Sequence, residues 1–189
     1  MTLESMQDLL IHELRDIYSA ENQLTKALPK MAKAAKTPEL KQAFQMHLDE
    51  TNNQVQRLDQ IFQTMGVSSR GPKCKGMEGL IVEGSDMMKE HAEPSVADAG
   101  LISSAQRVEH YEIAAYGGAR TFAQLLGMND VVGLLEQSLN EEKQADQKLT
   151  SIAEEWVNQS AIHGDGQGNQ MGQIEGQSGR TGARTMRSQ

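Results

Sequence analysis

Apolar side chains recur every three or four residues along four long stretches of this sequence. That spacing places them on one face of an α-helix, so we predict an all-α chain with four amphipathic helices packed on a shared core. The helices are expected to begin at Thr2, at Thr37-Pro38, at about Val96 or Asp98, and at Asn129. The second and third helices should end at Gly66 and Gly127, since glycine favours the left-handed conformation that closes a helix.

A long connection, about residues 67–95, separates the second and third of these helices. It is rich in Ser, Gly, Pro and Lys at first, and then carries a short helical pattern from Met77 to about His91. Simple up-and-down bundles use only short turns, whereas ferritin-like bundles use one long crossover. The pattern therefore predicts a ferritin-like antiparallel four-helix bundle over residues 1–160, with a long crossover that contains a short fifth helix.

Each long helix also carries carboxylate or amide side chains on or beside its apolar stripe. These residues are Glu21, Glu50 with Gln54, Glu109 with Glu112, and Glu142 with Asp146. A carboxylate on a core face is unfavourable unless it is protonated, paired or bound to a metal. Placed midway along four antiparallel helices, these groups should converge at the centre of the bundle.

The composition of the converging groups suits a dinuclear metal site, because two metal ions can share bridging carboxylates. Iron or manganese suits an oxygen-rich site of this type. Two positions are less certain from periodicity alone. Glu50 flanks a stripe that runs through Leu48 and Val55, so it is less central than Glu21 or Glu112, and both the bundle interior and an exposed shoulder are open to it. On the last helix, Glu141 is an alternative to Glu142. A metal-free cluster of protonated, hydrogen-bonded carboxylates is the other interpretation.

Other features narrow the class of protein. The net charge of −8 and pI near 5.1 argue against binding to nucleic acid. We found no run long and apolar enough to span a membrane and no leader-like start, so a cytoplasmic location is expected. The lone Cys74 cannot form an internal disulfide. Residues 161–189 are rich in Gly, Gln, Ser and Arg, and we predict a disordered tail whose partner is unknown.

Four segments, one on each predicted long helix, resemble the YciF-like stress proteins. They are Tyr18-Ser19-Ala20-Glu21-Asn22-Gln23-Leu24, His47-Leu48-Asp49-Glu50-Thr51, Arg107 to Tyr116, and Asn140-Glu141-Glu142-Lys143. The resemblance covers about residues 1–157 and places the chain in the ferritin-like superfamily. It implies a bacterial, cytosolic, stress-associated homodimer, and it implies no established biochemical activity.

Within that superfamily the chain is similar to rubrerythrin. The metal site of rubrerythrin uses Glu on the first helix, Glu-x-x-His on the second, Glu-x-x-Glu on the third and Glu-x-x-His on the fourth. The matching carboxylates are Glu21, Glu50, Glu109, Glu112 and Glu142. The two histidine positions hold Asn53 and Ala145 instead, although Gln54 and Asp146, each four residues after its Glu, are placed to reach inward.

The loss of both imidazoles should weaken iron binding and change its redox tuning. Iron remains the expected occupant, with manganese next, and weaker, oxygen-only binding of magnesium or calcium is also favoured. The resemblance thus implies a dimetal-carboxylate protein that binds and oxidises iron or consumes peroxide. A non-catalytic structural or interaction module with a vestigial site is the alternative. A DNA-protecting mini-ferritin is disfavoured by the acidic charge and the implied dimer. We interpret His47, one turn before Glu50, as a partly exposed surface residue, with hydrogen bonding next to the site as the alternative. We expect the inward series of the fourth helix to run from Val131 to Trp156.

Overall fold

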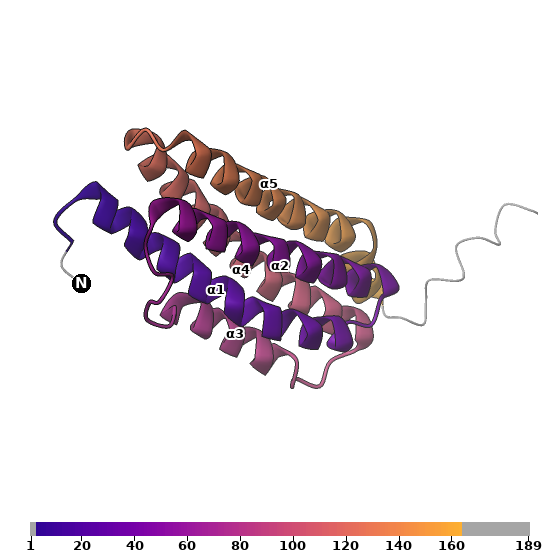
Figure 1. Cartoon of the computed structure of the whole chain (residues 1–189). Helices are drawn as coiled ribbons and strands as arrows, with labels where there is room; N and C mark the ends of the chain where they lie inside the picture. Colours follow the sequence, from indigo (N-terminus) through magenta and orange to yellow (C-terminus); the bar gives the residue numbers. More distant parts are fainter. Residues whose placement is uncertain (1–2, 164–189) are drawn as a thin grey trace, which may run out of the picture.

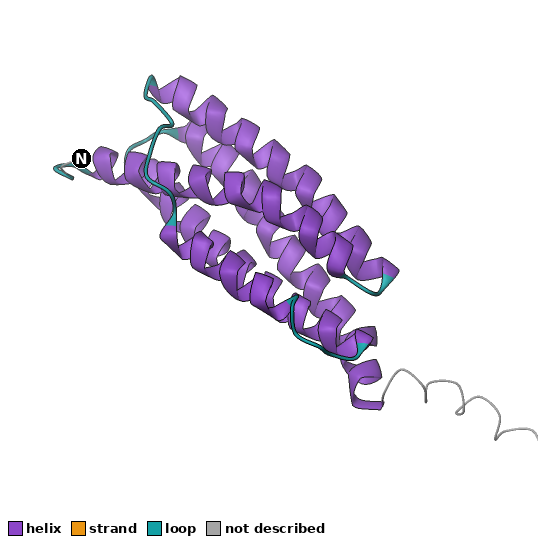
Figure 2. Ribbon diagram, turned by 90° about the horizontal axis from the view of Figure 1, so that it is seen from below, coloured by secondary structure: helices purple, strands orange, loops and turns teal. Residues whose placement is uncertain are grey.

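The computed structural model describes residues 3–163 of the chain. The helices are α1 (Met6–Ala34), α2 (Pro38–Met65), α3 (Lys75–Met87), α4 (Pro94–Leu125), α5 (Asn129–Ile152), the π-helical turn η1 (Ala153–Val157) and α6 (Asn158–His163). The prediction of an all-α chain is confirmed (Figure 2). Because helix continues to His163, it extends slightly past the predicted boundary at 160. Most of the predicted tail, residues 164–189, lies outside the described part of the chain.

Four of the helices form a bundle in which α1 packs on α2 and α4 packs on α5. The bundle closes through contacts between α2 and α5 and between α1 and α4 (Figure 1). Following the chain through Figure 1, each helix runs antiparallel to the bundle neighbours on both of its sides. The crossover from α2 to α4 makes this possible, and its helix α3 packs on α4 and α1. This is the predicted bundle with one long crossover.

The helix ends follow the expected capping chemistry, with two corrections. At the start of α1, the cap is Ser5, whose Oγ accepts a hydrogen bond from the Asp8 amide at 3.1 Å. The expected cap, Thr2, lies outside the described residues. The cap position of α5 is Met128, so that Asn129 is the first helical residue. Gly66 ends α2 with φ of 66°, as predicted.

The end of α5 differs from the regular periodicity, because η1 contains a π-helical turn. A π turn holds one residue more than an α turn, so it rotates the following residues about the helix axis. As a result Val157 is buried at 2% exposure, while Trp156 is 65% exposed. The prediction that Trp156 faces the core is therefore wrong. No helix within residues 3–163 is long and apolar enough to cross a membrane.

The buried side chains form two apolar clusters at opposite ends of the bundle. One contains Leu24, Phe44, Leu101 and Leu149, and the other contains Leu14, Leu58, Ala119 and Leu135. On every bundle helix the residues between the two clusters are polar, and they are buried. This polar layer comprises Glu21, His47, Thr51, Gln54, Glu109, Glu112, Ser138 and Glu142.

Candidate metal centre

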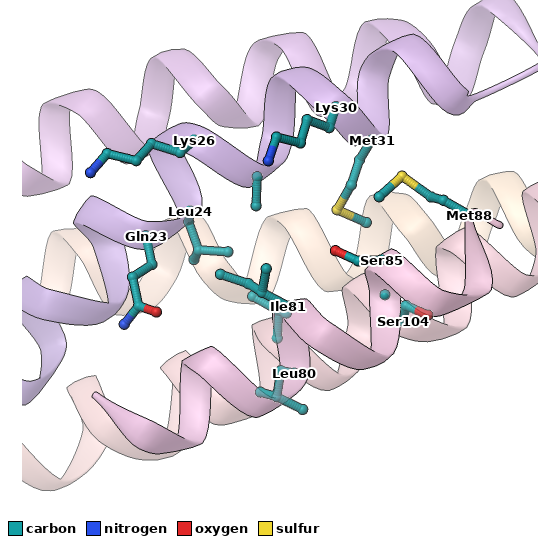
Figure 3. A pocket seen from close by; sticks show the side chains of 13 residues that line it. Gln23, Leu24, Lys26, Lys30, Met31, Leu80, Ile81, Ser85, Met88 and Ser104 are labelled. Atoms are coloured by element: carbon teal, nitrogen blue, oxygen red, sulfur yellow. The ribbon is translucent and has the colours of Figure 1, made fainter. Parts of the chain in front are cut away.

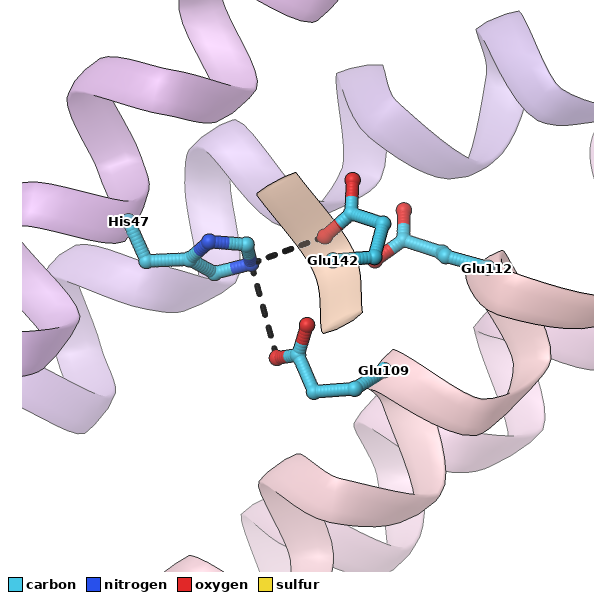
Figure 4. A group of neighbouring side chains, drawn as sticks. All are labelled: His47, Glu109, Glu112 and Glu142. Atoms are coloured by element: carbon cyan, nitrogen blue, oxygen red, sulfur yellow. Dashed lines mark ion pairs between the residues drawn. The ribbon is translucent and has the colours of Figure 1, made fainter. Parts of the chain in front are cut away.

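Four ionisable side chains meet at the middle of the polar layer (Figure 4). They are His47 from α2, Glu109 and Glu112 from α4, and Glu142 from α5. Each offers a nitrogen or oxygen atom, and these atoms all lie within 4.8 Å of one another. All four residues are buried, so water competes little for these atoms. We call this group the carboxylate–histidine cluster.

His47 lies at the centre of the cluster and is only 6% exposed, so its interpretation as a surface residue is wrong. Its Nε2 atom is 3.4 Å from Oε1 of Glu109 and 3.7 Å from Oε2 of Glu142. Its Nδ1 atom is 3.3 Å from Oε2 of Glu50. The imidazole therefore connects the buried carboxylates with a carboxylate at the edge of the bundle.

The periodicity of α2 explains why His47 was missed. The apolar residues Leu48 and Val55 suggested one stripe, yet both are only half-buried. The residues that face the core alternate at spacings of four and three: Leu40, Phe44, His47, Thr51, Gln54, Leu58 and Ile61. This alternation is the signal that would have found the histidine, because it continues unbroken through the polar layer.

Glu21 on α1 adds a side chain from the remaining helix of the bundle. It is fully buried, and the hydroxyl of Tyr116 donates a short hydrogen bond to its Oε1 atom. Oε2 of Glu21 has no hydrogen-bond partner in the described structure. Its carboxylate is also the charged group with the largest effect on Glu112, since burial and then Glu21 raise the pKa of Glu112 well above the usual range. Glu21 thus lies beside the cluster, as expected.

The remaining predicted site residues lie around the cluster rather than in it. Glu50 is 40% exposed and contacts the cluster through His47. Gln54 is buried, and its Nε2 atom donates to Oε1 of Glu142 at 2.5 Å. Asp146 is 24% exposed and accepts a 3.1 Å hydrogen bond from Nε2 of Gln106. As metal ligands, Glu50, Gln54 and Asp146 remain predictions.

The structure also separates Glu141 from Glu142. Glu142 is fully buried and belongs to the cluster. Glu141 turns toward Arg57, whose Nη2 atom donates to it at 2.5 Å. Arg57 donates in addition to Oγ of Ser138 at 2.6 Å. Since this arginine already neutralises Glu141, Glu142 is the carboxylate that faces the centre.

The carboxylates of the cluster are poorly satisfied. Among residues 3–163, neither oxygen of Glu112 has a hydrogen-bond partner, and Glu109 and Glu142 each keep one oxygen without a partner. Burial raises the pKa of Glu109, and it raises that of Glu142 well above the usual range. Burial likewise raises the pKa of Glu21 to about 7, against the opposing hydrogen bond from Tyr116.

His47 supplies the only positive charge that the described residues bring into the cluster itself. Burial alone disfavours its charged form, but Glu109, Glu50 and Glu142 outweigh burial and raise the pKa of His47 to about 10. One imidazolium cannot balance the four buried carboxylates of Glu21, Glu109, Glu112 and Glu142. The remaining charge must be removed by protons or by bound cations.

The sequence and the structure were compared with known proteins. The profile of the family described as "Domain of unknown function (DUF892)" matches residues 5–162. The chain belongs to this family. It is 44% identical over 162 residues to the protein YciF of Escherichia coli K12. The aligned region covers 85% of this chain and 98% of YciF.

Solved structures confirm the YciF-like fold. The crystal structure of the E. coli stress protein YciF matches with a TM-score of 0.80 over 82% of this chain and 99% of that one. YcfI from Rhodopseudomonas palustris is 47% identical, with a TM-score of 0.77 over 79% of this chain and 96% of its own. A Xanthomonas campestris protein with 19% identity and a TM-score of 0.67 shares the fold.

In this YciF-like chain the donor atoms fit a bound metal better than they fit a buried polar core without metal. Oxygen atoms predominate, one imidazole is present, and several donor atoms face inward without a partner in the described part of the protein. Such a set suits iron or manganese. A small apolar hollow between α1, α3 and α4, of about 80 Å³, contains no residue of the cluster (Figure 3). The candidate metal ligands therefore lie in the polar layer and not in this hollow.

Proposed function

We propose that this chain binds two divalent metal ions, with iron as the principal one, in the carboxylate–histidine cluster together with Glu21. The observation that carries this proposal is Glu112, a carboxylate that is 1% exposed and has no hydrogen-bond partner on either oxygen within residues 3–163. Glu21, Glu109, Glu112 and Glu142 would carry four negative charges when ionised. Two divalent cations match that charge, and His47 adds a nitrogen ligand.

The reaction proposed for the site is oxidation of iron by hydrogen peroxide. Two Fe²⁺ ions would supply the two electrons that reduce one peroxide molecule, with two protons, to two water molecules. Groups that hold protons lie beside the carboxylates, namely the imidazole of His47 and the hydroxyl of Tyr116. The E. coli relative is described as a stress protein, and removal of peroxide and free Fe²⁺ is a use for such a site under stress.

Metal analysis of the purified full chain tests the proposal. The protein is prepared without chelators, titrated with Fe²⁺ under anaerobic conditions, and then exposed to peroxide while peroxide consumption is measured. We expect two iron ions per chain, and loss of binding in Glu112→Gln and Glu142→Gln. Glu83→Gln, which removes the same charge from an exposed position on α3, should bind normally. Less than one iron or manganese per several chains would rule out the metal site.

A structural role without metal is the alternative, and one feature favours it. Three of the four buried carboxylates already have a partner inside the bundle: Tyr116 for Glu21, His47 for Glu109, and Gln54 for Glu142. A protonated network of this kind could hold the helices together by itself. In that case chelators would leave the melting temperature and the fold unchanged.

We also propose that the chain forms a homodimer in the cytoplasm, as the resemblance to the YciF-like proteins implies. Analytical ultracentrifugation of the full chain tests this. A monomer across the micromolar range would refute it.

A further inference from the structure

A hollow of about 380 Å³ lies between α2 and α5 and reaches the cluster from the side. Its lining includes Glu39, Ala43, His47 and Glu50 from α2, Glu109 from α4, and Ala145 and Lys148 from α5. We call it the α2–α5 hollow. Two of its lining residues, His47 and Glu109, belong to the cluster, so the hollow and the cluster share a wall.

From this geometry we infer that the α2–α5 hollow is the route by which divalent cations reach the buried site, with Glu50 as the carboxylate that receives them first. The inference rests on the proposed metal binding and adds the path and the residue that serves it. A site whose donor residues are all buried needs a passage from solvent, and within residues 3–163 this hollow touches two of the donors, His47 and Glu109.

Side-chain size explains why the hollow exists. Ala43 and Ala145 line it from opposite helices, and their short side chains leave space that larger residues would fill. Ala145 stands where the rubrerythrin pattern has a histidine ligand. Alanine in place of histidine at this position therefore has two effects: one imidazole is missing, and the side of the bundle is open.

The charges of the hollow favour a cation over an anion. Three carboxylates line it, Glu39 and Glu50 on α2 and Glu109 at the cluster, against two basic side chains, His47 and Lys148. A cleft lined mainly by one sign of charge raises the local concentration of the opposite ion. Glu50 is 40% exposed, so a hydrated cation can contact it without any change in the fold.

The second half of the route passes His47, which forms ion pairs with Glu109 and Glu142 (Figure 4). Its Nδ1 atom contacts Glu50, and its Nε2 atom lies 3.4 Å from Glu109 and 3.7 Å from Glu142. A cation at Glu50 is thus one imidazole away from the buried carboxylates. Rotation of His47 away from Glu109 and Glu142 would free their oxygen atoms and open the last step.

Rates of metal uptake and release test this route separately from the existence of the site. The full chain without metal is mixed anaerobically with Fe²⁺ in a stopped-flow instrument, and free Fe²⁺ is followed with a coloured chelator. Release is followed by mixing the iron-loaded chain with an excess of the same chelator. The number of ions bound at saturation is measured in parallel.

Ala145→Leu, which fills the hollow, should slow uptake and release by the same factor and leave the number of bound ions unchanged. Ala114→Leu makes the same change at an exposed position of α4 and should behave like the wild type. Glu50→Gln should slow uptake about tenfold, the scale of electrostatic attraction in a charged cleft. Asp49→Asn, the matched exposed control next to it, should have little effect.

The outcomes separate the two proposals. If wild type binds iron but Ala145→Leu and Glu50→Gln load at the wild-type rate, the route is wrong while the metal site stands. If Glu50→Gln binds fewer ions at saturation, Glu50 is a ligand of the bound metal, and its assignment to the entrance is overturned. A wild-type chain that takes up no iron refutes both.

Discussion

Replacement of Glu112 by leucine should stabilise the metal-free protein and abolish its stabilisation by metal. The residue is 1% exposed, and within residues 3–163 both of its oxygen atoms lack a hydrogen-bond partner. A buried polar group without a partner costs about 1–3 kcal/mol. Leucine of similar volume removes that cost and packs against the apolar clusters on either side.

For the chelated protein we therefore expect Glu112→Leu to raise the free energy of unfolding by about 1–3 kcal/mol. For a domain of this size, 1 kcal/mol corresponds to a shift in melting temperature of about 2–4 °C, so the increase should be about 2–12 °C. Added metal offsets this difference between the variant and the wild type. Fe²⁺ or Mn²⁺ at about one hundred times its dissociation constant should stabilise the wild type by about 2.7 kcal/mol. The variant should gain almost nothing.

Thermal unfolding followed by circular dichroism, with chelator and with added metal, measures both effects. Glu83→Leu is the control, because the same change at an exposed position should alter stability by about 0.5 kcal/mol or less. If chelated Glu112→Leu is less stable than the wild type, the carboxylate is compensated inside the bundle, and the reasoning from its unpartnered oxygens is wrong. If the variant keeps the full metal-induced shift, Glu112 is no ligand.

Three further predictions concern stability. Arg57→Ala should destabilise the chain by about 2 kcal/mol, because it removes the 2.5 Å contact to Glu141; urea unfolding measures this, and an unchanged midpoint would contradict it. Asp98→Ala should cost about 3 kcal/mol, because this buried carboxylate accepts two backbone N–H bonds of 2.8 Å from the α1–α2 loop; a loss below that of an exposed Asp→Ala variant would count against it. In the chelated protein, stability should fall as pH rises. The folded state raises the pKa of Glu21 from 4.5 to about 7, so the stability that this group contributes is lost as pH rises through that window. The pKa of His47 is raised from 6.5 to about 10, so its contribution is lost between those values. Melting temperatures measured across the two windows must decrease.

Much of the helical architecture could be predicted from the sequence. The start at Pro38 and the ends at Gly66 and Gly127 depend on local backbone chemistry, which is encoded by a few adjacent residues. The start of α4, expected at about Val96 or Asp98, lies at Pro94, because proline is well tolerated in the first turn of a helix. The long crossover required the ferritin-like connection. One exception is also local in origin. The π turn η1 changes which residue faces the core at the end of α5, and the periodicity of the sequence does not predict it.

The candidate site was predicted in part. Glu21, Glu109, Glu112 and Glu142 stood out because a carboxylate on an apolar stripe violates the usual pattern, and all of them are buried in the polar layer. The periodicity of α2 leaves Glu50 open between the bundle interior and an exposed shoulder, and the structure places it at the edge, 40% exposed. The roles of the four buried carboxylates as ligands remain predictions, to be tested by the metal titration.

What the sequence alone determined was that carboxylates on four helices lie at one level of a bundle. It could do so because helical periodicity is a property of each segment by itself. The rotation of each helix about its own axis was decided only by the packing of all four. That rotation brought His47 between Glu109 and Glu142 and turned Glu50 outward. A histidine is compatible with either face of a helix, so the tertiary contacts of α2 with α1 and α5 were required to place it.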